Sequence, residues 1–141
     1  MIEDFTIKDG IYLVSGEDTL DLHNNYDFTE ITYSVAERRA TLTWVRSSGD
    51  WVPATDPLEL QLEFHGVSCF RFMPRDPEMP FTEDDCLDSI GFTWDEMLAE
   101  MDGYTASESK DDCTHLIAMF ASSFSIKVGA EAVTLNVTTG A

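Results

Sequence analysis

The segment 58–65 alternates apolar and polar side chains without a break, and this alternation constrains the fold more than any other feature of the sequence. Its apolar positions are Leu58, Leu60, Leu62 and Phe64, and its polar positions are Glu59, Gln61, Glu63 and His65. Successive side chains of a β-strand point to opposite faces, so a strand here would bury one face and expose the other. Sheets covered on one side are typical of antiparallel β proteins.

The same period of two recurs along most of the chain. It predicts one hairpin within 11–23, a second within 28–47, a strand over 67–73, and a C-terminal hairpin built from 115–128 and 133–137. Two apolar faces are expected in the second hairpin: Ile31, Tyr33 and Val35 on one strand, and Ala40, Leu42 and Trp44 on the other. Gly66 marks a bulge or a tight turn, and we favour the turn. The prediction is a mainly-β domain, α+β by strict count, folded as an antiparallel sandwich or open barrel of about nine short strands.

One segment, 76–112, breaks the alternation and is rich in proline and acidic residues. Within it, Thr93 and Glu96 have the spacing of a helix capping box. The apolar residues Trp94, Met97, Leu98 and Met101 follow at helical spacing, and Gly103 can end the helix. We therefore expect a single domain over 1–141, with an acidic insert at about 76–112 that contains one amphipathic helix.

The charge balance limits the possible partners. The chain has 27 acidic and 8 basic residues, a formal net charge of -19. Phosphate backbones and anionic membranes are bound by clustered Lys and Arg, so neither nucleic acid nor a membrane is an expected partner. A field of this sign attracts basic proteins or cations. A solubilising surface, or a halophilic source, is an alternative reading of the same charge.

The predicted location is the cytoplasm, because no apolar run reaches the roughly 20 residues that span a bilayer and the first residues do not resemble a signal peptide. Cys69, Cys86 and Cys113 are an odd set with wide spacing, which favours reduced thiols. The oligomeric state stays open.

Acidic charge and aromatic residues coincide in the segment 76–112, which holds 13 acidic residues and one basic residue, Lys110. Aromatic anchors among carboxylates are a suitable surface for an Arg- and Lys-rich protein. The alternative is a solvated loop whose aromatic side chains point into the core, the commoner arrangement for an amphipathic helix. The candidate contacts with a basic partner are Glu83, Asp84, Asp85, Asp88, Trp94, Asp95 and Glu96.

Candidates for chemistry are few. Asp111, Cys113 and His115 would share one side of an extended chain and could ligate a metal ion, but no second ligand pair accompanies them, and an ordinary strand entry is the preferred reading. Asp21 and His23 could form an acid/base couple. Cys69 lies in an apolar strand, where an inert buried thiol is expected. The sequence contains no catalytic motif, so neither an enzyme nor a cofactor is expected.

Several runs in residues 20–75 resemble one group of proteins. They are Leu20-Asp21-Leu22-His23-Asn24, Ile31-Thr32-Tyr33, Thr41-Leu42-Thr43-Trp44 and the stretch from Leu58 to Val67. Together they are similar to small β-rich bacterial immunity proteins of polymorphic toxin systems and to related uncharacterised families. The runs consist mainly of core positions, which report fold rather than function, and the acidic segment 76–112 matches no motif of the group.

The resemblance implies a protein that binds and blocks a cognate toxin, often a basic nuclease, with carboxylates that stand in for phosphates. A second hypothesis, from a different class, is a small-molecule- or ion-binding β domain without catalysis. A third, a hydrolytic enzyme, would need His, Cys and Asp side chains to cluster in the fold.

Overall fold

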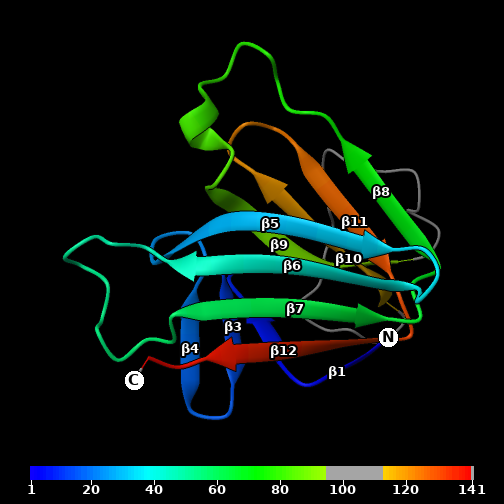
Figure 1. Ribbon diagram of the computed structural model, residues 1–141, viewed down its shortest axis with the longest axis horizontal. Helices are drawn as coiled ribbons and strands as arrows, with labels where there is room; N and C mark the ends of the chain where they lie inside the picture. The colour runs from blue at the N-terminus through cyan, green and yellow to red at the C-terminus, as the bar shows by residue number, and fades with distance from the viewer. Residues whose placement is uncertain (95–112, 141) are drawn as a thin grey trace.

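The computed structural model describes residues 1–94 and 113–140, and in this part the chain is mostly β (Figure 1). Three sheets make up the fold. The five-stranded sheet, in spatial order, consists of β1 (Ile2–Glu3), β12 (Ala132–Thr138), β7 (Glu59–His65), β6 (Arg39–Arg46) and β5 (Tyr26–Ser34). The four-stranded sheet consists of β8 (Cys69–Met73), β11 (Ser125–Gly129), β10 (Cys113–Phe120) and β9 (Leu87–Trp94). The three-stranded sheet consists of β2 (Thr6–Lys8), β3 (Tyr12–Ser15) and β4 (Asp18–Asp21).

The predicted mainly-β, sandwich-like fold is confirmed, with twelve strands in the described residues where about nine were expected. All neighbouring strands in the described ranges pair antiparallel except β1 and β12, which are parallel. In Figure 1 the five-stranded sheet lies in front of the four-stranded sheet, and the three-stranded sheet lies toward one end.

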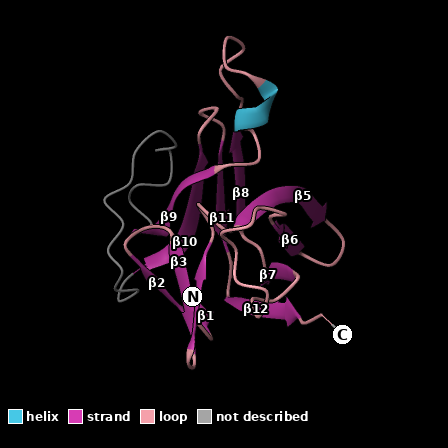
Figure 2. Cartoon of the chain, turned by 90° about the vertical axis from the view of Figure 1, so that its left-hand side faces the viewer, coloured by secondary structure: helices cyan, strands magenta, loops and turns pink. Residues whose placement is uncertain are grey.

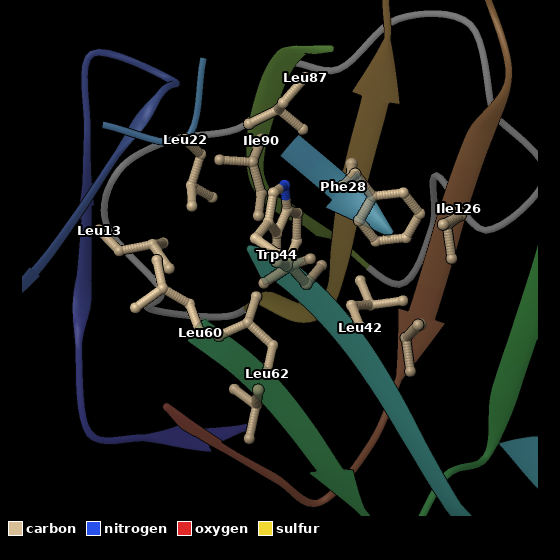
Figure 3. Packing of buried hydrophobic residues seen from close by; sticks show 14 of the residues in the cluster. Leu13, Leu22, Phe28, Leu42, Trp44, Leu60, Leu62, Leu87, Ile90 and Ile126 are labelled. Carbon is tan, nitrogen blue, oxygen red and sulfur yellow. The ribbon is translucent and has the colours of Figure 1, made fainter. Parts of the chain in front are cut away.

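The strand β7 has the one-sided burial that its alternation predicts. Leu60, Leu62 and Phe64 are fully buried, while the residues between them are half-buried. Leu58, the first residue of the alternating segment, precedes β7 and is exposed. The buried face of β7 joins a core to which all three sheets contribute, as Figure 3 shows for Leu13, Trp44 and Ile126.

Both predicted N-terminal hairpins are present. The strands β3 and β4 pair with Leu13 opposite Leu20, and β5 and β6 pair with a register shift between Phe28 and Glu30. The predicted apolar face of β6 is buried as expected. On β5 the outcome is mixed, because Ile31 is half-buried whereas Tyr33 and the following Val35 are exposed.

The predicted C-terminal hairpin between 115–128 and 133–137 is wrong. The strands β10 and β11 form a hairpin, but β11 then pairs with β8 and not with β12. The last strand, β12, pairs instead with β7 in the other sheet. Alternation is a property of one strand, and it does not indicate which strand becomes the neighbour.

The chain changes sheet at two points that lie together. Gly66, between β7 and β8, has a positive φ of 68°, and it turns the chain out of the five-stranded sheet instead of closing a hairpin. Between β11 and β12, the backbone N–H of Glu131 donates to the carbonyl of His65 at 3.0 Å. A Cβ at Gly66 would lie 2.6 Å from a carboxylate oxygen of Glu131. The positive φ favours glycine here, whereas the exposed Glu131 carboxylate can move away from an added Cβ.

The acidic segment 76–112 is not a simple insert, because its middle part is β9, a strand of the four-stranded sheet. Leu87, Ile90 and Phe92 on β9 belong to the core. The predicted helix is wrong at its first positions, since Thr93 and Trp94 are in β9 and pair with β10. Its remaining positions, 95–103, lie outside the described residues. The helix that the described part does contain is the short 3-10 helix η1 (Phe81–Glu83), in a loop that projects beyond the strands (Figure 2).

Candidate functional site: an apolar cleft with a carboxylate rim

An open cleft of about 470 Å³ lies where the loop 74–86 bridges the two larger sheets. Strand β5 contributes Phe28 and Ile31, strand β8 contributes Phe72, and the turn between β10 and β11 contributes Phe124. The loop completes the wall with Pro74, Arg75, Phe81, Asp84 and Asp85. The cleft therefore combines an apolar floor from the strands with a charged rim from the loop.

The floor is a set of stacked aromatic rings continuous with the core. Phe72 stacks on Phe124 with ring centroids 5.7 Å apart, and Phe124 stacks on Phe120 at 4.1 Å. Phe28 contacts both Phe120 and Phe124. Phe124 is buried, but 53% of Phe72 is exposed. Phe72 thus presents an aromatic surface that its neighbours support from behind.

Arg75 organises the loop 74–86. Its Nε donates to both carboxylate oxygens of Asp84, at 2.9 and 3.1 Å, and its Nη2 donates to the carbonyl of Met79 at 2.7 Å. The guanidinium also lies 4.5 Å from the centroid of the Phe81 ring. One cation therefore holds three points of the loop, while 80% of Phe81 remains exposed.

The two ends of the loop are fixed by backbone hydrogen bonds. The N–H of Asp76 donates to the carbonyl of Ser122 at 2.8 Å, next to the β10–β11 turn. At the other end, the N–H of Phe28 on β5 donates to the carbonyl of Asp85 at 2.9 Å. The loop consequently bridges the two sheets and forms one wall of the cleft.

The carboxylates of the rim differ in their electrostatic surroundings. The Ser122 hydroxyl and the Arg75 guanidinium lower the pKa of Asp84. Burial and the Asp85 carboxylate raise the pKa of Asp27, which lies behind the rim on β5. Among the rim acids that the structure describes, Asp84 is the one held in an ion pair. Negative charge at Asp85 and Asp27 is therefore left without a matching cation in the described residues.

The same charge acts on the neighbouring thiol. Burial and the carboxylates of Glu83, Asp85, Asp88 and Asp27 raise the pKa of Cys86. A nucleophilic cysteine needs the opposite shift. The Sγ atom lies 3.7 Å from Nδ1 of His23, whose ring also meets the carbonyl of Leu87 at 2.5 Å. This pair therefore fits a structural contact and not a catalytic dyad.

Two of the seven candidate contacts predicted from the sequence, Asp84 and Asp85, line the cleft. Glu83 ends η1 beside them, and Asp88 lies on β9 in a separate hollow with Met73 and Met119. Trp94 ends β9, and its side chain lies outside the described part of the chain. Asp95 and Glu96 lie outside it entirely.

The structure describes the surroundings of Asp21 and Cys69, two of the candidates for chemistry. Asp21 Oδ1 accepts from the backbone N–H of His23 and of Asn24, so Asp21 caps a turn and is not coupled to the His23 ring. Cys69, predicted to be buried, is half-buried.

Of the three metal candidates, His115 is the one whose side chain the structure describes. His115 is buried on β10, and its ring lies against Gly129, where an added Cβ would be 2.4 Å away. Cys113 is the first residue of β10, its side chain is not among those described, and Asp111 lies outside the described residues. Residues 1–94 and 113–140 contain no group of three or more His, Cys, Asp or Glu side chains placed to hold a metal ion. In the same ranges, no helix has the length and apolar character needed to cross a bilayer.

Sequence reasoning missed the residues that build the cleft, above all Arg75, Phe72 and Phe124. One signal was available for Arg75, which is the sole basic residue between Arg71 and Lys110 in the most acidic part of the chain. A single cation among many carboxylates indicates a structural ion pair. No local signal distinguishes Phe72 and Phe124 from ordinary strand residues, because their place in the cleft depends on which elements meet around them.

Comparison of the chain with protein families, with curated proteins and with solved structures finds no match. The resemblance to immunity proteins therefore stays a prediction, and the geometry of the cleft supplies the argument for function.

Proposed function

We propose that this protein is a non-catalytic interaction domain that binds a basic protein partner at the cleft. The observation that carries the proposal is the pairing of two exposed phenylalanines, Phe72 and Phe81, with the carboxylates of Asp84 and Asp85 around one depression. Exposed apolar surface with a polar rim marks interaction sites on soluble proteins. The negative rim selects a partner of positive charge.

The two phenylalanines can supply much of the binding energy. Full burial of one such side chain is worth about 1.5–3 kcal/mol. Binding hot spots are typically aromatic or arginine side chains surrounded by contacts that exclude water. Because Arg75 and the neighbouring rings already hold Phe81 and Phe72 in place, little side-chain entropy would be lost on association.

The net charge of -19 supports the same partner by a separate route, because it accelerates encounter with a basic protein in a salt-dependent way. A basic bacterial toxin is our more specific proposal for that partner, and the protein would then act as its immunity-type inhibitor. Carboxylates at the rim would form ion pairs with the cationic groups of the toxin that otherwise contact phosphates. The support for this role is the charge of the rim together with the family resemblance of residues 20–75.

The experiment is a pull-down of the tagged protein from its native lysate at low and high salt, followed by binding measurements with the recovered partner. We expect one basic protein, less retained at high salt. The double variant Phe72→Ala/Phe81→Ala should weaken its binding at least tenfold. Trp51→Ala is the matched aromatic control, because Trp51 is 67% exposed and lies outside the cleft.

A second pair of variants separates local from global charge. Asp84→Asn/Asp85→Asn at the cleft and Glu17→Gln/Asp50→Asn at distant exposed positions change the net charge equally. If both pairs slow association by the same factor, the partner responds to overall charge and the cleft is not its site. Unchanged binding by the phenylalanine variant would also remove the cleft from the proposal.

The size and lining of the cleft favour one other function, the binding of a small molecule. Its 470 Å³ falls within the roughly 300–1,000 Å³ of ligand pockets, and aromatic side chains dominate its floor. A ligand of this kind would raise the melting temperature by mass action. A melting screen of metabolites, repeated on the phenylalanine double variant, would reveal a shift that depends on the cleft.

A further inference from the structure

Within residues 1–94 and 113–140, strand β5 has one backbone edge beside the cleft that no other strand pairs with. It is the last strand of the five-stranded sheet, with β6 on its other side. At the start of this edge the N–H of Phe28 already donates to the carbonyl of Asp85. From residue 29 to residue 34, no other described segment forms a backbone hydrogen bond with the free edge. Unpaired edges of this kind are templates for another strand.

The free edge runs along the cleft. Phe28, Thr29 and Ile31 line the cleft, and further along β5 the Tyr33 ring stacks on Phe70 of β8 with centroids 4.8 Å apart. A strand residue occupies roughly 160 Å³, given a rise of about 3.3 Å, a strand spacing of about 4.8 Å and a sheet spacing of about 10 Å. The 470 Å³ of the cleft therefore has room for about three residues of extended chain.

We propose that the cleft admits an extended segment of the basic partner, which pairs with the free edge of β5 and adds a strand to the five-stranded sheet. This inference rests on the proposed function and specifies how the partner binds. Backbone hydrogen bonds to β5 would supply affinity, and alternate side chains would supply specificity. The carbonyl of Asp85 already occupies the position at which the added strand would begin.

The two sides of the cleft define the sequence that such a segment needs. Its inward side chains would meet Ile31, Phe72 and Phe124, which selects apolar residues. Its outward side chains would lie beside Glu30 and Thr32, which are exposed on the outer face of β5. Opposite charges across neighbouring strands are favourable, so the outward positions select Arg or Lys. The partner segment should alternate apolar and basic residues.

A second copy of this chain is a poor occupant of the same edge. Each copy carries a net charge of -19, and pairing two β5 edges would bring the two acidic cleft rims close together. Like charges on facing strands are destabilising. The charge of the cleft thus opposes self-association and favours a basic segment.

The test uses a seven-residue peptide of alternating arginine and valine with blocked ends. One control is the same peptide with the valine backbone nitrogens methylated, which preserves charge but removes alternate hydrogen-bond donors. A second control has the same composition with its arginines and valines in two blocks. Calorimetry measures affinity, and amide hydrogen exchange reports the backbone of residues 29–34.

We expect the alternating peptide to bind at least tenfold more tightly than either control and to slow amide exchange in β5. The variant Phe72→Ala/Phe81→Ala should weaken this binding at least tenfold, whereas Trp51→Ala should not change it. Both substitutions are at exposed side chains, so both variants should fold. Analytical ultracentrifugation should show a monomer with and without the peptide.

Equal binding of the methylated and unmethylated peptides would overturn strand addition and leave the proposed function intact. If none of the three peptides bound, but binding of a recovered basic partner still depended on Phe72 and Phe81, strand addition would again be overturned and the proposed function would remain. Failure of the peptides together with a partner insensitive to those two residues would overturn the site as well. Association through β5 in the absence of peptide would make a second copy the occupant.

Discussion

The inner face of the five-stranded sheet is covered in two different ways. Around Trp44 and Leu60 it is covered by buried side chains of the two other sheets, among them Leu13, Ile90 and Ile126 (Figure 3). Beside Ile31 it meets the loop 74–86 and leaves the cleft open. The comparison shows how one apolar face becomes core at one end and a candidate binding site at the other.

The difference follows from the kind of chain that provides the cover. The two other sheets satisfy their own backbone by pairing, so they can press apolar side chains onto the core. The loop 74–86 contains Pro74, Pro77 and Pro80 and several carboxylates that must stay hydrated. Arg75 and backbone hydrogen bonds near its two ends hold the loop in place. It therefore spans the cleft without filling it with side chains.

The largest expected contrast is between one buried and one exposed aromatic residue. Trp44→Ala should lower the free energy of unfolding by about 3–5 kcal/mol, because it leaves a cavity in the buried core. Phe81→Ala should change it by no more than about 0.5 kcal/mol, because that ring is mostly in water. Urea unfolding measures both values. If Phe81→Ala lowered the free energy of unfolding by more than about 2 kcal/mol, the cleft would be part of the core and the two regions would not differ.

Two tyrosines of β5 provide the next contrast. The hydroxyl of Tyr26 is buried and donates to the carbonyl of Pro57 at 2.8 Å, while Tyr33 is exposed and stacks on Phe70 beyond the cleft. Tyr26→Phe should cost about 1–2 kcal/mol, because the buried carbonyl loses its donor. Tyr33→Phe keeps the stacked ring and should be nearly neutral. Equal costs in thermal or urea unfolding would contradict the distinction between the two regions.

A smaller and local effect is expected for Arg75→Ala. The Arg75–Asp84 pair is partly exposed, so its loss should change global stability by no more than about 1 kcal/mol. Amide exchange over residues 76–84 should accelerate because three contacts are lost together. Arg39→Ala is the matched control, since Arg39 pairs with Glu63 within the five-stranded sheet. A uniform acceleration throughout the protein would show that the loop does not open independently.

The smallest effect concerns the pH dependence of stability. Because burial and Asp85 raise the pKa of Asp27, the folded state binds this proton more readily than the unfolded state. The resulting stabilisation is lost as pH rises through the raised pKa. Asp27→Asn should therefore be more stable than the wild type near neutral pH, and the difference should shrink toward the ordinary pKa of aspartate.

Asp84 should behave in the opposite sense. Its pKa is lowered, so its stabilising contribution is present above the ordinary aspartate pKa and is lost as pH falls through the lowered value. Asp84→Asn should cost stability near neutral pH, and this cost should disappear in acid. Urea unfolding of both variants across the acidic range checks the two signs. The same sign for both would mean that the two carboxylates share one environment.

Local patterning predicted the strands far better than it predicted their neighbours. The burial of Leu60 and Leu62 followed from alternation, and the β3–β4 and β5–β6 hairpins followed from alternation plus short connections. The β11–β12 connection was equally short, yet the chain changes sheet there. The helix prediction failed at Trp94 because this residue also continues the period-two pattern of Ile90 and Phe92, and pairing with β10 decides in favour of the strand.

Alternation and charge are properties of the sequence, and they are enough to predict a mainly-β fold with strands buried on one face and an acidic surface. Only the tertiary structure decided that Phe28, Phe72 and Phe124 share one floor and that Arg75 holds Asp84 beside it. The edge of β5 next to this floor is likewise left without a partner strand among the described residues. These features depend on which distant strands become neighbours, and that choice is made by burial of the whole core and not by any single segment.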